Sequence, residues 1–138
     1  MMYEALKLRA WIADEKRYIN VANVEWGDYG ADVAENGEDG YLVNWSDIDM
    51  YTGVDDEAGV PIYTNDIVYA PVYELEDWFK LREQRIICTL PSIEMVYNDM
   101  NDGRLYTQYL ADMKDGDKLR VVGNTREGVT HDAHGNRL

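Results

Sequence analysis

Hydrophobic and polar residues alternate near the start of the chain, which is the pattern of strands with one buried face. The segment "ALKLRAWI" places Leu6, Leu8, Ala10 and Ile12 on one face, with two basic residues and a Trp on the other. The turn "DEKR" separates it from "YINVANVEW", which we expect to be a second strand that pairs with the first as a hairpin. Similar short segments recur every eight to twelve residues between turn residues. This spacing predicts a mainly β protein, built as a sandwich or as small barrels.

The remaining strands are expected in short apolar segments. "ADVAE" and "YLVNW" flank the turn "NGEDG", and "RIICTL", "SIEMVYN", "RLYTQYL" and "KLRVVGN" follow later in the chain. One segment has a helical period instead. In "ELEDWFKLREQR", Leu75, Trp78, Phe79 and Arg82 recur at i, i+3, i+4 and i+7. The pattern therefore predicts at most one short helix in an otherwise β fold.

Acidic residues are concentrated in one part of the chain. The net charge is −14, and fifteen Asp and Glu residues lie between Arg17 and Lys80 without one intervening Lys or Arg. A negative field of this kind repels phosphate backbones and anionic lipid, so it disfavours direct nucleic-acid binding and attracts basic protein surfaces. The alternative is that the charge only keeps the protein in solution. The candidate acidic interaction surface consists of Asp28, Asp32, Glu35, Glu38, Asp39, Asp47, Asp49, Asp55 and Glu57.

No residue pattern indicates catalysis, a cofactor or a metal. The only two histidines, His131 and His134, lie close to the C-terminus, where two ligands make a weak metal site. The sequence has no phosphate-binding glycine motif, and its single cysteine, Cys88, lies in an apolar segment typical of a core. We therefore predict a protein that is not an enzyme and takes no cofactor.

Aromatic residues are frequent inside the acidic part of the chain. Because Tyr and Trp commonly anchor protein interfaces, these rings are candidates either for the core or for a protein contact. They are Trp26, Tyr29, Tyr41, Trp45, Tyr51 and Tyr63. No apolar segment is long enough to span a bilayer and no secretion signal is visible, which together with a lone cysteine predicts a cytoplasmic protein.

The connector "YTGVDDEAGVPIYTNDIVY" resembles the signature of the YopX family of phage and prophage proteins. "LKLRAW" is similar to the family's opening segment, and "LRVVGN" is similar to its closing segment. Asn65 stands where the family usually has Gly, and Asn tolerates the same left-handed bend. The residues that carry the resemblance and serve as its structural signature are Trp11, Tyr51, Gly53, Asp56, Gly59, Tyr63, Asp66 and Gly123.

The resemblance implies two linked β units and a bacterial host. We expect an N-terminal unit at residues 1–60, an SH3-like β unit at 61–125 and a polar, frayed tail at 126–138. Within the connector we expect Gly53 at a tight backbone position, Asp56 and Gly59 in the turn, and Asp66 capping the next bend. The family has no established catalytic residues to carry over.

Two functions follow as hypotheses. The first is an accessory protein of a phage or prophage that binds an unidentified protein partner and forms a homo-oligomer in the bacterial cytoplasm. The second is an acidic DNA mimic, which would occupy a basic nucleic-acid-binding surface of a host or defence protein.

Overall fold

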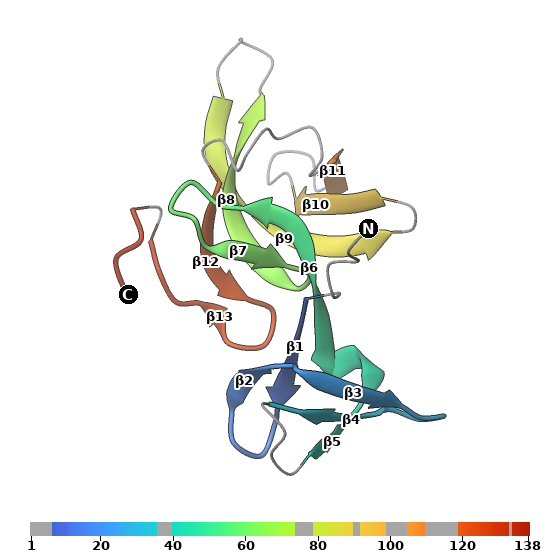
Figure 1. The fold of residues 1–138 in the computed structure, drawn as a ribbon. Helices are drawn as coiled ribbons and strands as arrows, with labels where there is room; N and C mark the ends of the chain where they lie inside the picture. Colours follow the sequence, from blue (N-terminus) through green and yellow to red (C-terminus); the bar gives the residue numbers. More distant parts are fainter. Residues whose placement is uncertain are drawn as a thin grey trace, which may run out of the picture. The chain divides into compact units, whose positions relative to one another are not determined.

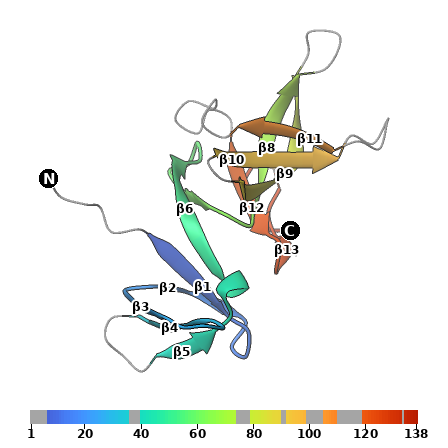
Figure 2. The same cartoon turned by 90° about the vertical axis from the view of Figure 1, so that its right-hand side faces the viewer.

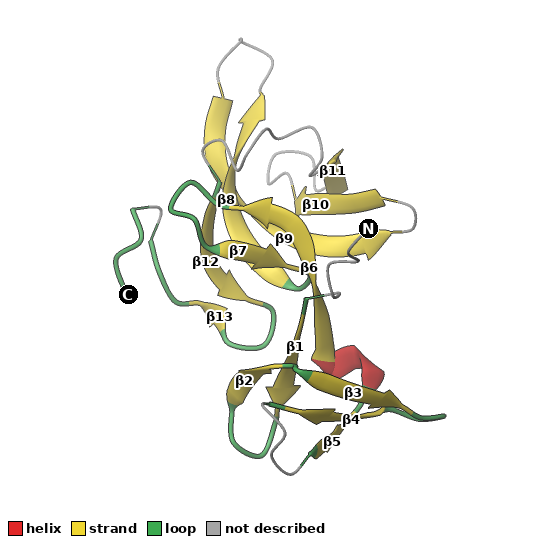
Figure 3. Ribbon diagram, viewed as in Figure 1, coloured by secondary structure: helices red, strands yellow, loops and turns green. Residues whose placement is uncertain are grey.

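The computed structural model describes residues 7–35, 40–73, 79–89, 92–98, 105–109, 119–132 and 134–138. These residues form strands and a single 3-10 turn, Trp45–Asp47, so the prediction of a mainly β fold is confirmed (Figure 3). The chain divides into two compact units, Met1–Tyr51 and Thr52–Leu138. The acidic turn after Gly53 therefore belongs to the second unit, although the sequence pattern placed it at the end of the first.

The first unit is a small sandwich of two sheets (Figure 1). In one sheet, β1 (Leu8–Ile12) pairs antiparallel with β2 (Arg17–Asn20) and with the first residues of β6 (Ile48–Asp55). The other sheet has the order β3-β4-β5, with the strands Asn23–Trp26, Ala31–Ala34 and Tyr41–Val43. The inward-facing residues of the two sheets meet in one core: Ala10, Ile12, Ile19, Ala31, Val33 and Val43. The expected single strand "YINVANVEW" is thus two strands, β2 and β3, which lie in different sheets.

The second unit contains a curled six-stranded sheet of order β11-β10-β9-β8-β12-β13, which forms half of a barrel (Figures 1 and 2). Its strands are β8 (Asp66–Tyr73), β9 (Phe79–Thr89), β10 (Ser92–Asn98), β11 (Leu105–Tyr109), β12 (Arg120–Asn124) and β13 (Gly128–Val129). The short strand β7 (Pro61–Tyr63) neighbours β6. The core of this unit is formed by Ile62, Val68, Ala70, Ile86 and Leu119.

The helix predicted within residues 74–85 is wrong for the part that the structure describes. Residues 79–85 belong to β9, which pairs with β8 on one side and with β10 on the other. Residues 74–78 lie outside the described residues. Pairing with the preceding strand β8 satisfies backbone hydrogen bonds of residues 79–85, and this pairing overrides the local helical period. Cys88 lies in the same strand.

The residues after Asn124 are part of the second unit rather than a separate tail. Strand β13 pairs with β12, and His131 and Arg137 form an isolated bridge farther on. Gly123 makes this pairing possible, because a Cβ built on it would lie 2.0 Å from the Gly128 carbonyl oxygen. Backbone hydrogen bonds from Thr130 and His131 to the Val122 carbonyl continue the connection.

The connector folds through side-chain carboxylates that accept backbone hydrogen bonds. Asp56 Oδ1 accepts from the N–H groups of Ala58 and Val60, both at 2.9 Å, and Gly59 between them has a φ of 83°. Gly53, before the turn, has a φ of 84°. Such positive values favour glycine, since a Cβ clashes with the backbone there.

The second bend of the connector is built in the same way. The buried carboxylate of Asp66 accepts a hydrogen bond from the Tyr63 N–H at 2.8 Å. Asn65 occupies the bend with a φ of 68°. Asp56, Gly59 and Asp66 therefore form and stabilise the two bends of the connector.

Candidate functional site

Asp49 does not belong to an acidic surface, contrary to the sequence-based expectation. Its side chain is fully buried, and Arg9 Nε donates to its Oδ2 at 2.9 Å. The Arg9 guanidinium also lies over the Tyr18 ring, 4.2 Å from the ring centroid. Trp11, on the same strand as Arg9, contacts Tyr18 edge-on with ring centroids 4.9 Å apart. Asp49 is therefore a partner in a buried ion pair between neighbouring strands.

Other acids of the predicted surface have basic partners from outside the acidic part of the chain. Glu57 accepts from Arg120 Nη2 at 2.9 Å, and Glu35 lies 4.0 Å from Arg17 Nη1. Asp47 Oδ2 accepts from the Asn44 N–H at 3.2 Å, while Asp55 is exposed. Glu38 and Asp39 lie outside the described residues. Among the described residues, the charge is consequently divided between carboxylates with hydrogen-bond or ion-pair partners in the fold and exposed carboxylates.

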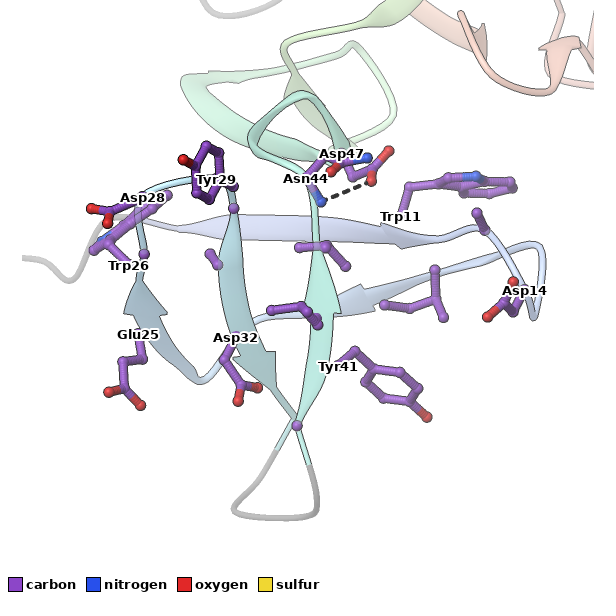
Figure 4. A pocket seen from close by; sticks show the side chains of 18 residues that line it. Trp11, Asp14, Glu25, Trp26, Asp28, Tyr29, Asp32, Tyr41, Asn44 and Asp47 are labelled. Atoms are coloured by element: carbon purple, nitrogen blue, oxygen red, sulfur yellow. Dashed lines mark hydrogen bonds between the residues drawn. The ribbon is translucent and has the colours of Figure 1, made fainter.

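Five carboxylates of the first unit line one hollow (Figure 4). The hollow has a volume of about 930 Å³, and its lining contains neither Lys nor Arg. Its carboxylates are Asp14, Glu25, Asp28, Asp32 and Asp47, and its aromatic rings are Trp11, Trp26, Tyr29 and Tyr41. Asp28 and Asp32 are thus the residues of the predicted acidic surface that the structure places together in an exposed setting.

Three large aromatic side chains surround the hairpin between β3 and β4. Tyr29, in the turn, is 93% exposed, Trp26 at the end of β3 is 58% exposed, and Trp45 is 53% exposed. Trp45 is held at the hairpin because its indole N–H donates to the Gly30 carbonyl at 2.8 Å. We name Trp26, Tyr29 and Trp45 the aromatic tip. Exposed aromatic groups of this size are characteristic of protein contacts.

The segment "WGDYG" explains how the tip is displayed. The Gly27 N–H donates to the Gly30 carbonyl at 2.8 Å, which closes a tight turn with Asp28 and Tyr29 at its end. Gly30 packs closely against β5, since a Cβ there would lie 2.2 Å from the Val43 carbonyl oxygen. The turn therefore holds Tyr29 outward on a short, constrained loop.

The structure separates the six aromatic candidates that the sequence left as one group. Tyr63 is buried in the second unit, and Tyr51 is half-buried with Lys7 Nζ 5.1 Å from its ring centroid. The half-buried Tyr41 accepts a hydrogen bond from Arg17 Nη2 at 3.2 Å. Only the three rings of the aromatic tip are largely exposed. The sequence analysis did not single out Leu42, which is 86% exposed. The alternation of side chains in "YLV" is the one sequence signal that places Leu42 on the outward face.

The titratable groups with perturbed pKa values lie at the surface. The hydrogen bond from Arg17, followed in weight by that from Tyr41, lowers the pKa of Glu15 from its ordinary value of 4.5. The same pairing with Glu15 raises the pKa of Arg17. In the C-terminal segment, backbone hydrogen bonds from Asn136 and then His134 lower the pKa of Asp132. These shifts come from local hydrogen bonds rather than from a polar cavity.

The histidines lie in an ordered C-terminal turn. His131 Nδ1 is 2.7 Å from Thr130 Oγ1, and the His134 N–H donates to Asp132 Oδ1 at 2.9 Å. Within the part of the chain that the structure describes, no three His, Cys, Asp or Glu side chains gather in a way that could hold a metal ion. The same residues contain no helix that is long and apolar enough to cross a membrane.

Comparisons with known proteins returned no match: no family model, no curated protein and no solved structure is similar to this chain. The assignment to the YopX family and the SH3-like description of the second unit therefore stay predictions.

Proposed function

We propose that this chain is a phage or prophage accessory protein that acts by binding another protein in the bacterial cytoplasm, without catalysing a reaction. The observation that carries the proposal is the aromatic tip. Three large rings from β3, its hairpin turn and the 3-10 turn remain largely exposed in one small unit. The resemblance of the connector to the YopX signature supports the phage origin and the expected self-association.

The physical argument for binding is the cost of leaving these rings in water. Burial of an aromatic side chain removes a large apolar area from solvent, and such residues dominate the energetics of protein interfaces. The tight turn from Gly27 to Gly30 fixes their backbone in advance, which reduces the entropy lost on binding. The surrounding carboxylates favour a partner with a basic surface and increase its rate of association.

A DNA mimic is the second candidate, and the exposed Asp14, Glu25, Asp28 and Asp32 support it. The pairing of Asp49 and Glu57 weighs against it, because those two charges are compensated by Arg9 and Arg120. Binding by a mimic would also weaken steeply with salt and would be displaced by DNA.

The test is capture of partners from a bacterial lysate with wild-type protein and with the double variant W26A/Y29A. V60A is the matched control, because Val60 is also exposed, at 45%, but lies in the second unit. We expect a partner that wild type and V60A retain at high salt and that W26A/Y29A loses, with unchanged thermal unfolding of both variants. Sedimentation equilibrium on the purified proteins then measures self-association separately.

Three results would contradict the proposal. Equal retention of the partner by all three proteins removes the aromatic tip from the interface. Loss of the partner with V60A as well, at unchanged thermal unfolding, means that the contact does not depend specifically on the aromatic tip. Release of the partner by DNA, together with loss at moderate salt, favours the DNA mimic instead.

A further inference from the structure

The sheet formed by β3, β4 and β5 has an outer face that carries no covering element among the described residues. Its inward-facing residues, including Ala31, Val33 and Val43, are buried in the core of the first unit. The alternate residues Asn23, Glu25, Asp32 and Leu42 are exposed. Because side chains of a strand alternate between faces, these four residues share the outer side of the sheet.

The centre of this face holds two carboxylates directly opposite each other. Glu25 on β3 pairs in register with Asp32 on β4, and Asp32 in turn pairs with Leu42 on β5 (Figure 4). Side chains directly opposite in an antiparallel pair have Cβ atoms about 5 Å apart, and like charges at such positions destabilise the sheet. Within the described residues, no Lys or Arg forms an ion pair with either carboxylate.

Gly40 and Leu42 shape the surface around this pair. A Cβ at position 40 would lie 1.9 Å from Asp32 Oδ1, so the carboxylate of Asp32 lies over a residue without a side chain. Leu42, at 86% exposure, provides an apolar surface directly beside it. The face thus combines an apolar contact with two negative charges that have no basic partner among the described residues.

We propose that this face docks an arginine-bearing segment of the protein partner, with one guanidinium bridging Glu25 and Asp32. This inference rests on the proposed function, because it names the chemistry of the partner that the first unit binds. A guanidinium is planar and has several N–H donors, so it can donate to both carboxylates at once, whereas an ammonium acts as a point charge. The methylene stem of the arginine lies on Leu42. Binding removes the repulsion between the two carboxylates.

The test uses a defined probe and the full-length protein. The probe is a fluorescent, terminally blocked peptide with Arg and Thr at alternate positions, and its Arg→Lys version is the comparison. Anisotropy titrations at low and moderate salt compare wild type with E25Q/D32N. E15Q/E35Q is the matched control, since it removes the same number of charges from the same unit at residues that pair with Arg17 and do not line the hollow.

We expect E25Q/D32N to bind the arginine peptide at least tenfold more weakly than wild type, and E15Q/E35Q to bind it nearly as well as wild type. Wild type should also prefer the arginine peptide over the lysine peptide, and this preference should disappear in E25Q/D32N. E25Q/D32N should unfold at a slightly higher temperature than wild type, so a loss of binding does not reflect misfolding.

The inference is overturned if both double variants weaken binding equally, because general attraction to an acidic protein then explains the data. The inference is also overturned if E25Q/D32N binds the peptide like wild type. A third contradicting result is loss of self-association in E25Q/D32N, because the occupant of the face would then be a second copy of the chain. The W26A/Y29A variant separates this outcome from the proposed function. If W26A/Y29A loses the lysate partner but E25Q/D32N binds the peptide as wild type does, the present inference is wrong and the proposed function stands.

Discussion

The two units use the same kind of side chain for different purposes. In the second unit, Asp56 and Asp66 are buried and accept backbone hydrogen bonds, and Glu57 is paired with Arg120. In the first unit, Glu25 and Asp32 lie opposite each other in an exposed sheet face with no basic partner among the described residues. A stretch of acids that is uniform in sequence therefore contains structural carboxylates, which include Asp49 of the first unit, and exposed carboxylates that are available for binding.

This difference shows why a count of charges along the chain describes a surface poorly. The Arg partners of Asp49 and Glu57 are forty and sixty-three residues away in sequence, outside the acidic part of the chain. A carboxylate that is compensated in this way contributes to the fold, and only the uncompensated ones remain for a partner. Four predictions test this distinction, beginning with the largest expected effect.

Replacement of Asp49 by Ala should destabilise the protein by about 3–5 kcal/mol, because it removes the fully buried carboxylate that accepts the hydrogen bond from Arg9 Nε. Urea unfolding measures the loss. Combination with R9A in a double-mutant cycle should recover part of it, since the two side chains act as a pair. A loss below about 1 kcal/mol would mean that Asp49 is not a structural residue of the first unit. This result would contradict the distinction between structural and exposed carboxylates.

Replacement of Asp56 by Asn should cost about 1–3 kcal/mol. The carboxylate accepts from the Ala58 and Val60 N–H groups through Oδ1 and from the Val121 N–H through Oδ2. An amide has only one acceptor oxygen, so at least one of these donors loses its partner.

D28N is the control for D56N, because Asp28 is exposed in the hairpin turn. We expect its effect on the free energy of unfolding to stay within about 0.5 kcal/mol. If the two variants were equally stable, the acidic turn of the connector would not depend on Asp56.

The double variant E25Q/D32N should stabilise the protein by roughly 0.2–1 kcal/mol, since it removes a like-charge pair from adjacent strands. The gain should shrink as salt is added, because salt screens exposed charges. Thermal unfolding at low and high ionic strength measures both effects. A loss of stability would indicate that these carboxylates support the fold.

The smallest effect on stability is expected when the pH is lowered and Asp132 in the C-terminal turn becomes protonated. Asp132 Oδ1 accepts from the Asn136 and His134 N–H groups, both at 2.9 Å, and these bonds lower the pKa of Asp132 from its ordinary value of 3.8. The stability contributed by a carboxylate with a lowered pKa is fully present above the unfolded value and is lost as the pH falls through the folded one.

The turn at Asp132 should therefore be intact above about pH 4 and should open below it. An NMR titration that follows the Asn136 amide reports the change. The same amide in D132A should show no such transition. A transition well above pH 5 would contradict the assignment to Asp132.

Much of the fold could be predicted from local patterns, because alternation reports which face of a strand is buried. The hairpin of β1 and β2 and the turn at Gly59 follow directly from such signals. The strand β9 could not be recognised in this way. Its helical period competed with pairing to β8 and β10, the strands that precede and follow it, and a pattern within the segment does not report that pairing.

The candidate site was predictable only in part. The sequence showed acids and aromatic residues in the same part of the chain, with Asp28, Asp32, Trp26 and Tyr29 among them, but left the rings open between the core and a protein contact. Their grouping depends on the hairpin at Gly27 and Gly30 and on the hydrogen bond from Trp45 to the Gly30 carbonyl. The importance of Glu25 depends on strand register, which a count of charges does not contain.

The most direct test compares D32N with D56N in the same two measurements, the free energy of unfolding and the affinity for the arginine peptide. We predict that D32N keeps or gains stability and loses affinity, whereas D56N loses stability and, while folded, keeps its affinity. If D32N instead lost stability and bound the peptide as wild type does, the exposed acids of the first unit would be structural and the account would be wrong.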